Sequence, residues 1–410
     1  MDNLTHSLVG LAAGELIHRY LPDESDAAAR SLRHRLLLTA CWAASNFPDL
    51  DLFLTPLLPA PLGYLLHHRG HTHTLFYALP QALLLWAMLW LLWPGARSLL
   101  KSSVDARKGL ALALAAGFGL HLLMDAMNSY GIHPFHPFDS RWLFGDMVFI
   151  LEPVFWIAFG IPLVLMVQSG WARVLLLALL LGAPLFFTLK GFLHWASLGA
   201  LLLLALALGG LQHKTQKRSI ALLLAFGIAI GFVGIQAFAS REATHLVAAR
   251  LKAEDPSSRL LDAAMTAFPA NPLCWMFVSV ESRDDAGTYR LRRGRLSLMP
   301  AVLPVSQCPA GFAEGEPAGA ADDAIVLFYR EDDSLAVLRT LQREDCHVDA
   351  WLRFARMPSV NDTEASDLRY ASRLRENFTT LDIDKSRRNA CPGMVPGWAY
   401  PRKDLLTPGG

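Results

Sequence analysis

The clearest indication of the fold comes from His67–Trp93, which reads HHRGHTHTLFYALPQALLLWAMLWLLW. Its second part, Leu75–Trp93, contains no charged side chain. A run of about 20 apolar residues, rising ~1.5 Å each, is long enough to cross the hydrocarbon core of a bilayer. Its first part places four histidines within seven residues, directly before this run. The stretch therefore predicts a membrane helix that begins at a cluster of potential metal ligands.

Further apolar runs of similar length fill the chain up to about residue 240. They are Gly109–Met127, Val148–Val167, Trp171–Leu189, Phe192–Leu211 and Ile220–Ala239. Two shorter runs, Leu4–Ile17 and Leu36–Ala44, carry polar residues at one end. The 410-residue chain is 53% hydrophobic and 18% charged, whereas soluble chains carry about 25% charged residues. We predict a mainly α fold class, a polytopic transmembrane helical bundle with a C-terminal α+β extramembrane domain.

The basic residues of the connections predict the orientation of this bundle. Lys and Arg gather in alternate connections, which lie at residues 19–35, 97–108, 173 and 214–218. The remaining connections hold only Arg69, Arg141 and Lys190. If both short runs cross the membrane, all basic connections fall on one side, and this side is the cytoplasm by the positive-inside rule. The N-terminus and the region after Ala239 are then expected outside.

Charge returns after residue 240, and residues 241–410 are predicted to form a separate extracytoplasmic α+β domain. We expect a helix over Glu242–Lys252 and strands over Cys274–Val280, Thr288–Leu298 and Ala324–Tyr329. Residues 156–240 are predicted to contribute additional transmembrane helices, and residues 1–155 to contain the functional site. The net charge of +1 is uninformative, and no basic stripe along the sequence indicates a nucleic-acid partner.

Four of the five cysteines lie in the C-terminal region. They are Cys274, Cys308, Cys346 and Cys391. An even number fits two disulfides in an oxidising compartment, and three pairings are open. The alternative is a cytosolic domain with four free thiols.

Ionisable residues near the apolar runs form five groups, and such residues mark functional sites because burying them in a membrane is costly. In the first group, Asp2 and His6 lie one helical turn apart, although Asp2 also suits a helix cap. Gly10 and Gly14 continue their stripe and predict close packing of another helix. In the second group, Asp49 and Asp51 follow Pro48, where two nearby carboxylates repel unless a cation or a proton lies between them. The alternative for this pair is a solvated turn.

The third and fourth groups carry the strongest pattern. The third is the histidine cluster His67, His68, His71 and His73, with Arg69 and Gly70 between them. In the fourth, His121 and Asp125 have the i,i+4 spacing that puts both side chains on one face of a helix. The fifth group contains His133, His136 and Glu152, and its two histidines also suit an ordinary loop. The orientation, derived from Lys and Arg alone, places all five groups on the outer side.

These motifs resemble the bacterial inner-membrane-bound, metal-dependent hydrolase family. The resemblance covers residues 1 to about 155. It is carried by His6, by Pro48-Asp49-Leu50-Asp51, by His68-Arg69-Gly70-His71-Thr72-His73, and by His121 with Asp125. It implies a multi-pass protein of the bacterial inner membrane. It also ranks His68 and His73 above His67 and His71.

The order of the motifs is also similar, more loosely, to zinc-dependent phospholipase C and its related single-strand nucleases. That family requires a further histidine four residues before Glu152, where this chain has Val148. This departure argues against a full three-metal site.

The expected activity is hydrolysis by a metal-activated water, with a divalent metal ion, zinc in the first place, as cofactor. The predicted metal ligands are His6, Asp49, Asp51, His68, His73, His121 and Asp125. Asp49 or Glu152 is the candidate general base, and Arg69 the candidate phosphate-binding residue. The second-tier residues are Asp2, His67, His71, His133 and His136.

The position at the outer face of a lipid bilayer favours a phosphoester or a lipid-linked substrate. One alternative is a divalent-metal transporter, or a metal-binding membrane protein without hydrolytic activity. Another is a membrane half that only anchors the outer domain.

Overall fold

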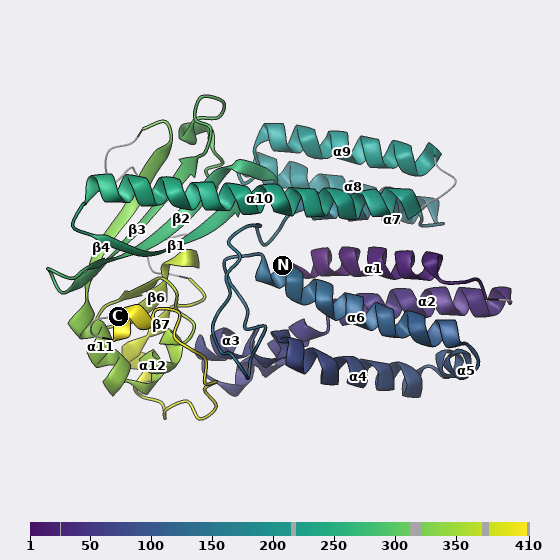
Figure 1. Ribbon diagram of the computed structural model, residues 1–410, viewed down its shortest axis with the longest axis horizontal. Helices are drawn as coiled ribbons and strands as arrows, with labels where there is room; N and C mark the ends of the chain where they lie inside the picture. Colours follow the sequence, from purple (N-terminus) through teal and green to yellow (C-terminus); the bar gives the residue numbers. More distant parts are fainter. Residues whose placement is uncertain (25, 215–218, 312–321, 371–376, 408–410) are drawn as a thin grey trace.

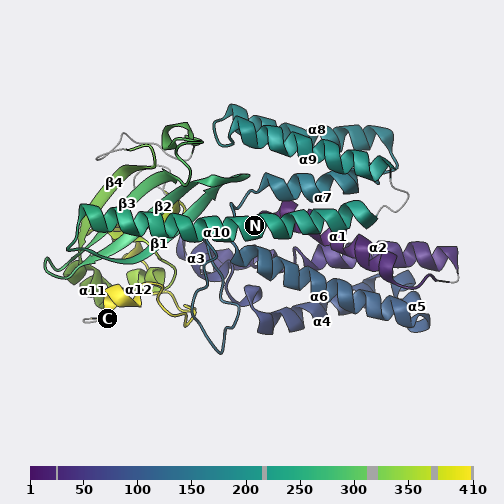
Figure 2. The ribbon, with the colours of Figure 1, turned by 45° about the horizontal axis from the view of Figure 1, so that its top comes forward.

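A computed structural model describes residues 1–24, 26–214, 219–311, 322–370 and 377–407 (Figure 1). Long helices lie side by side in one half of the molecule, and antiparallel strands with short helices form the other half (Figures 1 and 2). The predicted fold class is therefore confirmed: the protein is rich in helices, with a C-terminal region built on antiparallel sheet.

Among the described residues, eight long helices build the bundle. They are α1 (Asn3–Tyr20), α2 (Ala27–Ala44), α4 (Leu75–Leu92), α6 (Val104–Ala126), α7 (Pro153–Leu165), α8 (Gly170–Leu189), α9 (Trp195–Lys214) and α10 (Ser219–Glu254). Within the described part of the chain, five of them, α4, α6, α8, α9 and α10, are long and apolar enough to cross a membrane. The protein is thus a membrane protein. Short elements complete this half: η1 (Pro48–Leu57), α3 (Leu62–His67), η2 (His71–His73) and α5 (Pro94–Ser102).

Three helices differ from the expected runs. Helices α1 and α2 have 18 residues each, longer than predicted, because their polar and charged residues belong to the helices. Helix α7 begins only at Pro153, since Glu152 accepts a hydrogen bond from the backbone of Val154 and caps the helix. With 13 residues, α7 is shorter than the predicted span Val148–Val167.

Small residues bring α1, α2 and α6 into close contact. A Cβ atom at Gly10 of α1 would lie 2.5 Å from Ser45 Oγ and 3.0 Å from the carbonyl oxygen of Cys41. A Cβ atom at Gly117 of α6 would lie 2.5 Å from the Cβ of Ala44. The predicted close packing along Gly10 and Gly14 is confirmed, and its partner is α2. This packing fixes α6 beside α1 and α2, and α6 carries two of the candidate ligands.

The C-terminal half contains a four-stranded antiparallel sheet in the order β1-β2-β3-β4. Its strands are β1 (Arg259–Phe268), β2 (Asn271–Arg283), β3 (Thr288–Ser297) and β4 (Ile325–Ser334). The three predicted strands correspond to β2, β3 and β4. The predictions for β3 and β4 each extend one residue beyond the observed strand. Strand β1 was missed. Its sequence, RLLDAAMTAF, contains three alanines and only one β-branched residue, a composition that does not favour a strand.

A second, three-stranded sheet and several short helices pack beside the first sheet. The strands are β5 (Pro358–Val360), β6 (Glu364–Asp367) and β7 (Leu381–Asp382). The helices are η3 (Val305–Gln307), α11 (Leu335–Glu344), α12 (Cys346–Leu352), η4 (Leu368–Tyr370), α13 (Ile383–Ser386) and α14 (Lys403–Leu406). The disulfides Cys274–Cys308 and Cys346–Cys391 are formed, so the prediction of two disulfides in this region is confirmed.

Helix α10 belongs to both halves. It runs without interruption from Ser219 to Glu254, and the expected boundary at residue 240 falls inside it (Figure 1). Its last turns pack Ala243, Val247 and Leu251 against Phe277 and other buried residues of the four-stranded sheet. The predicted helix over Glu242–Lys252 is the end of α10.

The two ends of the bundle differ in character. The end that faces the sheet holds the beginnings of α1, α4, α7 and α9 and the ends of α2, α6 and α8 (Figures 1 and 2). All five groups of candidate residues lie at this end. The basic connections lie at the opposite end, although Lys217 and Arg218 fall outside the described residues.

Candidate metal centre

Four buried side chains converge at the sheet-facing end of the bundle. Asp49 comes from η1, His73 from η2, and His121 and Asp125 from α6. Each offers one ligand atom, and these atoms lie within 4.8 Å of one another. Two imidazole nitrogens and two carboxylate oxygens at one point form a donor set that suits a divalent cation. We call these four residues the ligand group.

The distances within the ligand group centre on His73. Its Nε2 lies 3.0 Å from His121 Nε2, 3.1 Å from Asp125 Oδ2 and 3.3 Å from Asp49 Oδ1. His73 is the last residue of the single 3-10 turn η2, and the next residue, Thr74, caps α4. The side chain therefore projects from the beginning of a membrane helix toward α6.

The backbone orients the second histidine. His121 Nδ1 lies 2.7 Å from the carbonyl oxygen of Ser45, where α2 ends. A carbonyl only accepts, so Nδ1 carries the proton and Nε2 keeps its lone pair. That Nε2 faces His73, Asp125 and Asp49. Metal-binding histidines usually have such a hydrogen bond on the other ring nitrogen.

Asp51 lies behind the ligand group and holds two histidines in place. Its carboxylate accepts hydrogen bonds from His68 Nδ1 and the backbone N–H of Arg69, both at 2.9 Å, and from Thr72 Oγ1 at 2.5 Å. His73 Nδ1 lies 3.3 Å from Asp51 Oδ2. The structure thus places the predicted ligands Asp51 and His68 next to the ligand group, with Asp51 bound to the outer nitrogen of His73.

The charges of this site shift the pKa values of its members outside the helices. Burial alone would raise the pKa of Asp51, but hydrogen bonds with His68 and His73 outweigh burial and lower it. Burial alone would lower the pKa of His73, but hydrogen bonds with Asp125, Asp49 and Asp51 raise it to about 10. Three carboxylates around one imidazole therefore attract positive charge strongly, whether it is a proton or a metal ion.

His6, which lies beside Asp125, carries two buried ring nitrogens without hydrogen bonds. The ring of His6 stacks on that of His121 at 4.1 Å, and its Nε2 lies 3.3 Å from Asp125 Oδ1. In the described part of the chain, neither ring nitrogen of His6 makes a hydrogen bond, whereas Asp125 Oδ2 pairs with His73 Nε2 at 3.1 Å. Leaving such groups buried and unsatisfied costs about 1–3 kcal/mol each. A cation held at Asp125 would remove this cost, so the residues fit a metal ion.

Arg69 lies on the other side of Asp125. Its Nη2 is 2.9 Å from Asp125 Oδ1, and its Nη1 donates to Asn128 Oδ1 at 3.1 Å. The guanidinium lies over the ring of Tyr130, 4.8 Å from the centroid. Arg69 has a φ of 58°, a left-handed conformation that is uncommon for a residue other than glycine. The bond from its backbone N–H to Asp51 stabilises this turn, which brings His68 and His73 to the same site.

The second-tier residues lie around the site rather than in it. Asp2 caps α1 by accepting hydrogen bonds from the backbone and hydroxyl of Thr5. His133 is buried between the rings of Trp142 and Trp398. The exposed His71 lies 5.2 Å from the ring of His136, and His67 is buried with its Nε2 unbonded within the described residues.

Glu152 is buried at the junction of the two halves. It accepts hydrogen bonds from the backbone N–H groups of Val154 at 3.1 Å and of Ala270, in the turn after β1, at 3.0 Å. Burial, with the nearby charge of Asp2, raises the pKa of Glu152 to about 8, although these two hydrogen bonds oppose the shift. Its carboxyl group therefore joins α7 to the sheet region.

Sequence reasoning missed several polar partners of the ligands. Asn3 Nδ2 donates to Asp49 Oδ2 at 3.2 Å, and Thr72 bonds Asp51. The amino group of Met1 contacts Asp125. Thr72 lies inside the histidine motif, so its position was a usable signal. Asn3 and the carbonyl of Ser45 gave no signal, because neither a backbone carbonyl nor a single amide side chain forms a sequence pattern that indicates a role.

Comparisons with known proteins match only part of the chain. Residues 1–195 match the family model described as YdjM inner membrane protein. The chain is 28% identical over 158 residues to the uncharacterized protein YfhP of Bacillus subtilis (strain 168), a match that covers 38% of this chain and 44% of that protein. The chain thus spans less than half the length of this curated relative. No solved structure matches. The similarity supports an inner-membrane protein, and the metal-dependent hydrolase family stays a prediction.

Proposed function

We propose that this protein is a membrane-bound, metal-dependent hydrolase that acts at the extracytoplasmic face on a phosphoester or lipid-linked substrate. The ligand group carries the proposal: four buried ligand atoms lie within 4.8 Å of one another. Two carboxylates that are buried in an apolar bundle lose their hydration and repel each other. A cation bound between them offsets both costs.

Three of the four residues suit the role of metal ligands. His73, His121 and Asp125 are fully buried, whereas 8% of the surface of Asp49 is exposed to solvent. Catalytic zinc sites commonly use three protein ligands and keep one position open. A divalent ion at such a site supplies Lewis acidity and lowers the pKa of water to about 7. We assign zinc as the first candidate because the donors are nitrogen and oxygen atoms in a set of three or four.

Asp49 and Arg69 provide the remaining chemistry. Asp49 Oδ1 faces the nitrogens of His73 and His121, so it can take a proton from water at the open position. We favour Asp49 over Glu152 as the general base because the carboxylate of Glu152 already accepts two backbone hydrogen bonds. Arg69 Nε is buried and has no hydrogen-bond partner within the described residues. It therefore offers a donor to a phosphoryl oxygen.

The orientation supports action outside the cytoplasm. The ligand group lies at the end of the bundle opposite the basic connections, and the positive-inside rule assigns those to the cytoplasm. Two disulfides in the sheet region agree with this assignment, since disulfides persist in oxidising compartments. A substrate at this face is available from the bilayer surface or from the outer aqueous side.

Metal content is the first test. Elemental analysis of the protein purified in lipid nanodiscs is expected to find bound divalent metal, and His73→Ala and His121→Ala are expected to lose it. The matched control is His71→Ala, in the same motif but exposed. Equal metal content in wild type, His73→Ala and His121→Ala would overturn the site and favour a membrane half that serves only as an anchor.

Turnover is the second test. The metal-loaded protein is expected to hydrolyse bis-p-nitrophenyl phosphate, a chelator to abolish this activity, and added Zn²⁺ to restore it. Asp49→Asn is expected to keep the metal and lose at least 100-fold in kcat, a common contribution of a general base. Stoichiometric metal without turnover of any ester class contradicts the hydrolase, and metal uptake into proteoliposomes would then identify a transporter.

A further inference from the structure

A cavity of about 460 Å³ lies between the four-stranded sheet and the sheet-facing end of the bundle. We call it the interface pocket, and residues that line it include Asn128, Phe149, Phe192, Thr266, Phe268 and Arg369. Its volume falls within the range of small-molecule sites, about 300–1,000 Å³. Its walls come from both halves of the molecule, so the pocket exists only because the sheet region covers the bundle.

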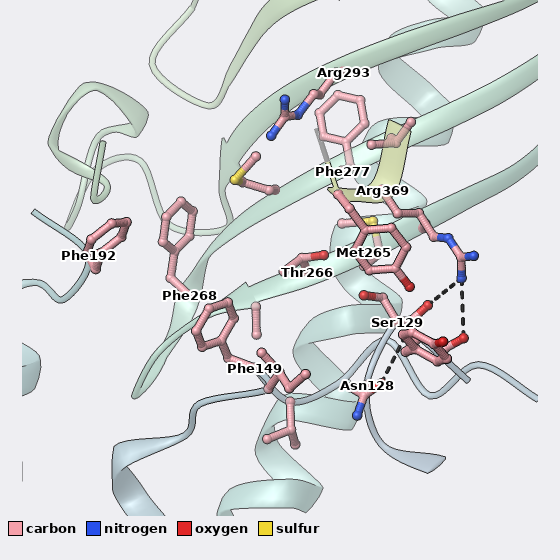
Figure 3. A pocket seen from close by; sticks show the side chains of 18 of the residues that line it. Asn128, Ser129, Phe149, Phe192, Met265, Thr266, Phe268, Phe277, Arg293 and Arg369 are labelled. Atoms are coloured by element: carbon pink, nitrogen blue, oxygen red, sulfur yellow. Dashed lines mark hydrogen bonds between the residues drawn. The ribbon is translucent and has the colours of Figure 1, made fainter. Parts of the chain in front are cut away.

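The interface pocket has an apolar side and a polar side (Figure 3). Phe149, Phe192 and Phe268 gather on one side of the view. On the other side lie Asn128, Ser129 and Arg369, where Arg369 Nη1 donates to the carbonyl oxygen of Ser129 at 2.7 Å. A ligand that fills the pocket is therefore expected to have an apolar part and a polar end.

The polar side is joined to the ligand group through Arg69, which does not itself line the pocket. Asn128 lines the pocket and accepts a hydrogen bond from Arg69, whose Nη2 lies 2.9 Å from Asp125. Tyr130 also lines the pocket and lies beneath the Arg69 guanidinium. A polar end placed at Asn128 thus lies beside Arg69 and close to the candidate metal ligands.

The charges of the lining favour an anionic ligand. Among the described residues that line the pocket, Arg293 and Arg369 are charged and none is acidic, although Arg369 already pairs with Asp367 behind the lining at 2.8 Å. Burial lowers the pKa of Arg293 to about 10, so the side chain stays positive at neutral pH. An anion nearby would stabilise this partly desolvated charge.

The apolar side lies at the level where the helices leave the membrane. Val148, Phe149 and Ile150 precede α7, and Phe192 lies between α8 and α9. Ile150 lines the pocket and also exposes 41% of its surface. A hydrocarbon chain from the bilayer therefore meets an apolar side chain at the edge of the pocket.

We propose that the interface pocket binds the hydrocarbon chain of a phosphate-bearing amphiphile from the membrane, with the phosphate at Asn128, on the side of the pocket that lies next to Arg69. The sheet region then provides chain specificity for the reaction in the bundle. The inference rests on the proposed function for its substrate class, although binding itself needs no turnover.

The test uses photo-crosslinking in lipid nanodiscs with the full-length protein. The probe is dodecyl phosphate with a diazirine in its chain, and decyl, dodecyl and tetradecyl phosphates compete with it. Crosslinks are expected on β1 and β2, near Thr266 and Met276. Because a chain that comes from the bilayer already lies in an apolar medium, its length matters through its fit to the cavity, so the three phosphates are expected to compete unequally. Dodecanol, which lacks the charge, is expected to compete poorly.

Thr266→Trp tests the pocket itself. The large side chain is expected to fill the cavity and shift the preferred competitor to shorter chains, a change that simple misfolding does not produce. The matched control is Thr363→Trp, at an exposed threonine between β5 and β6. It is expected to leave crosslinking unchanged.

The outcomes separate this inference from the proposed function. Crosslinking that persists in His73→Ala, together with absent turnover in wild type, supports the pocket and overturns the hydrolase. Crosslinks spread over α4 and α8 with no effect of Thr266→Trp overturn the pocket, whatever the turnover. Equal competition by all three chain lengths overturns it as well.

Discussion

At the scale of single residues, the site separates groups that face the candidate metal from groups that hold them. Asp51 illustrates the second kind, since it bonds His68, Thr72 and the backbone of Arg69 and approaches the outer nitrogen of His73. Its neighbour Asp49 faces the inner nitrogens instead. Two carboxylates two residues apart thus have different surroundings, and different substitutions are expected to separate their roles.

Asp51→Asn is expected to weaken metal binding 10- to 100-fold without removing the ligands, because the amide no longer accepts as strongly from two imidazoles and a hydroxyl. Competition with a metal-sensitive chelator measures the affinity. Asp139→Asn, whose carboxylate pairs with Arg141 at the surface, is the control. An affinity equal to that of the wild type would show that Asp51 does not orient the histidines.

Glu152 predicts a dependence of stability on pH. Its pKa is raised to about 8 in the folded protein from an ordinary value of 4.5. The contribution of Glu152 to the free energy of unfolding is therefore fully present below about pH 4.5. It is lost as the pH rises from about 4.5 to about 8, at about 1.4 kcal/mol per pH unit. Glu152→Gln keeps an acceptor and no charge, so thermal unfolding of this variant is expected to lose less stability between pH 5 and 8. Parallel pH profiles for the two proteins would refute this.

At the scale of elements, the position of the ligands depends on how closely the helices pack. Gly117 lies one turn before His121 on α6, and a Cβ atom there would lie 2.8 Å from the carbonyl oxygen of Cys41. Gly119, on the same helix, has no atom within 4 Å of its virtual Cβ. The two glycines therefore form a matched pair.

Gly117→Val is expected to destabilise the protein by about 1–3 kcal/mol through overpacking, and to reduce metal content by moving His121 away from Ser45. Gly119→Val is expected to leave the metal content unchanged. Thermal unfolding in nanodiscs and elemental analysis measure the two effects. Similar losses in both variants would mean that helix propensity, rather than close approach, decides the result.

The sequence predicts elements well where a single physical property decides them. Hydropathy located α4, α6, α8, α9 and most of α10, because a membrane helix needs a long apolar run. It extended α7 too far, since Met147–Leu151 is apolar but continues as a loop up to the cap at Glu152. It missed β1, because the pairing of this strand with β2 depends on neighbours that are distant from any local pattern.

The sequence predicted which residues belong to the candidate site, but not how each of them is placed in it. The i,i+4 spacing indicated His121 and Asp125, and the histidine cluster indicated His73. The separation of His73 from His71, one buried and one exposed, depends on a single turn whose shape follows from the left-handed Arg69. Likewise, Asp49 and Asp51 lie on opposite sides of His73, which no spacing rule distinguishes.

At the scale of the whole molecule, one arginine connects the bundle to the sheet region. Arg356 binds Asp146, in the segment before α7, with two bonds of 2.8 and 2.9 Å, and also Asp262 of β1. The pair of carboxylates raises the pKa of the buried Arg356, despite the opposing effect of burial. The arginine therefore stays charged and holds the two halves together.

Arg356→Ala is expected to destabilise the protein by about 3–5 kcal/mol, because two partly buried carboxylates lose their counter-charge. Limited proteolysis is expected to release the sheet region sooner than in the wild type. Arg141→Ala, which breaks an exposed pair with Asp139, is expected to change neither measurement. Unaltered proteolysis of Arg356→Ala would show that other contacts join the halves.

Helix α10 has a consequence for how a bound molecule comes and goes. Its 36 residues form a continuous rod of about 54 Å, which ends in the core of the four-stranded sheet. An uninterrupted helix offers no hinge, so the four-stranded sheet cannot open away from the bundle. A ligand of the interface pocket must then enter laterally, between the outer ends of the helices and the surrounding lipid. Exchange would follow the diffusion of molecules within the leaflet, and the fluidity of the membrane would set its pace.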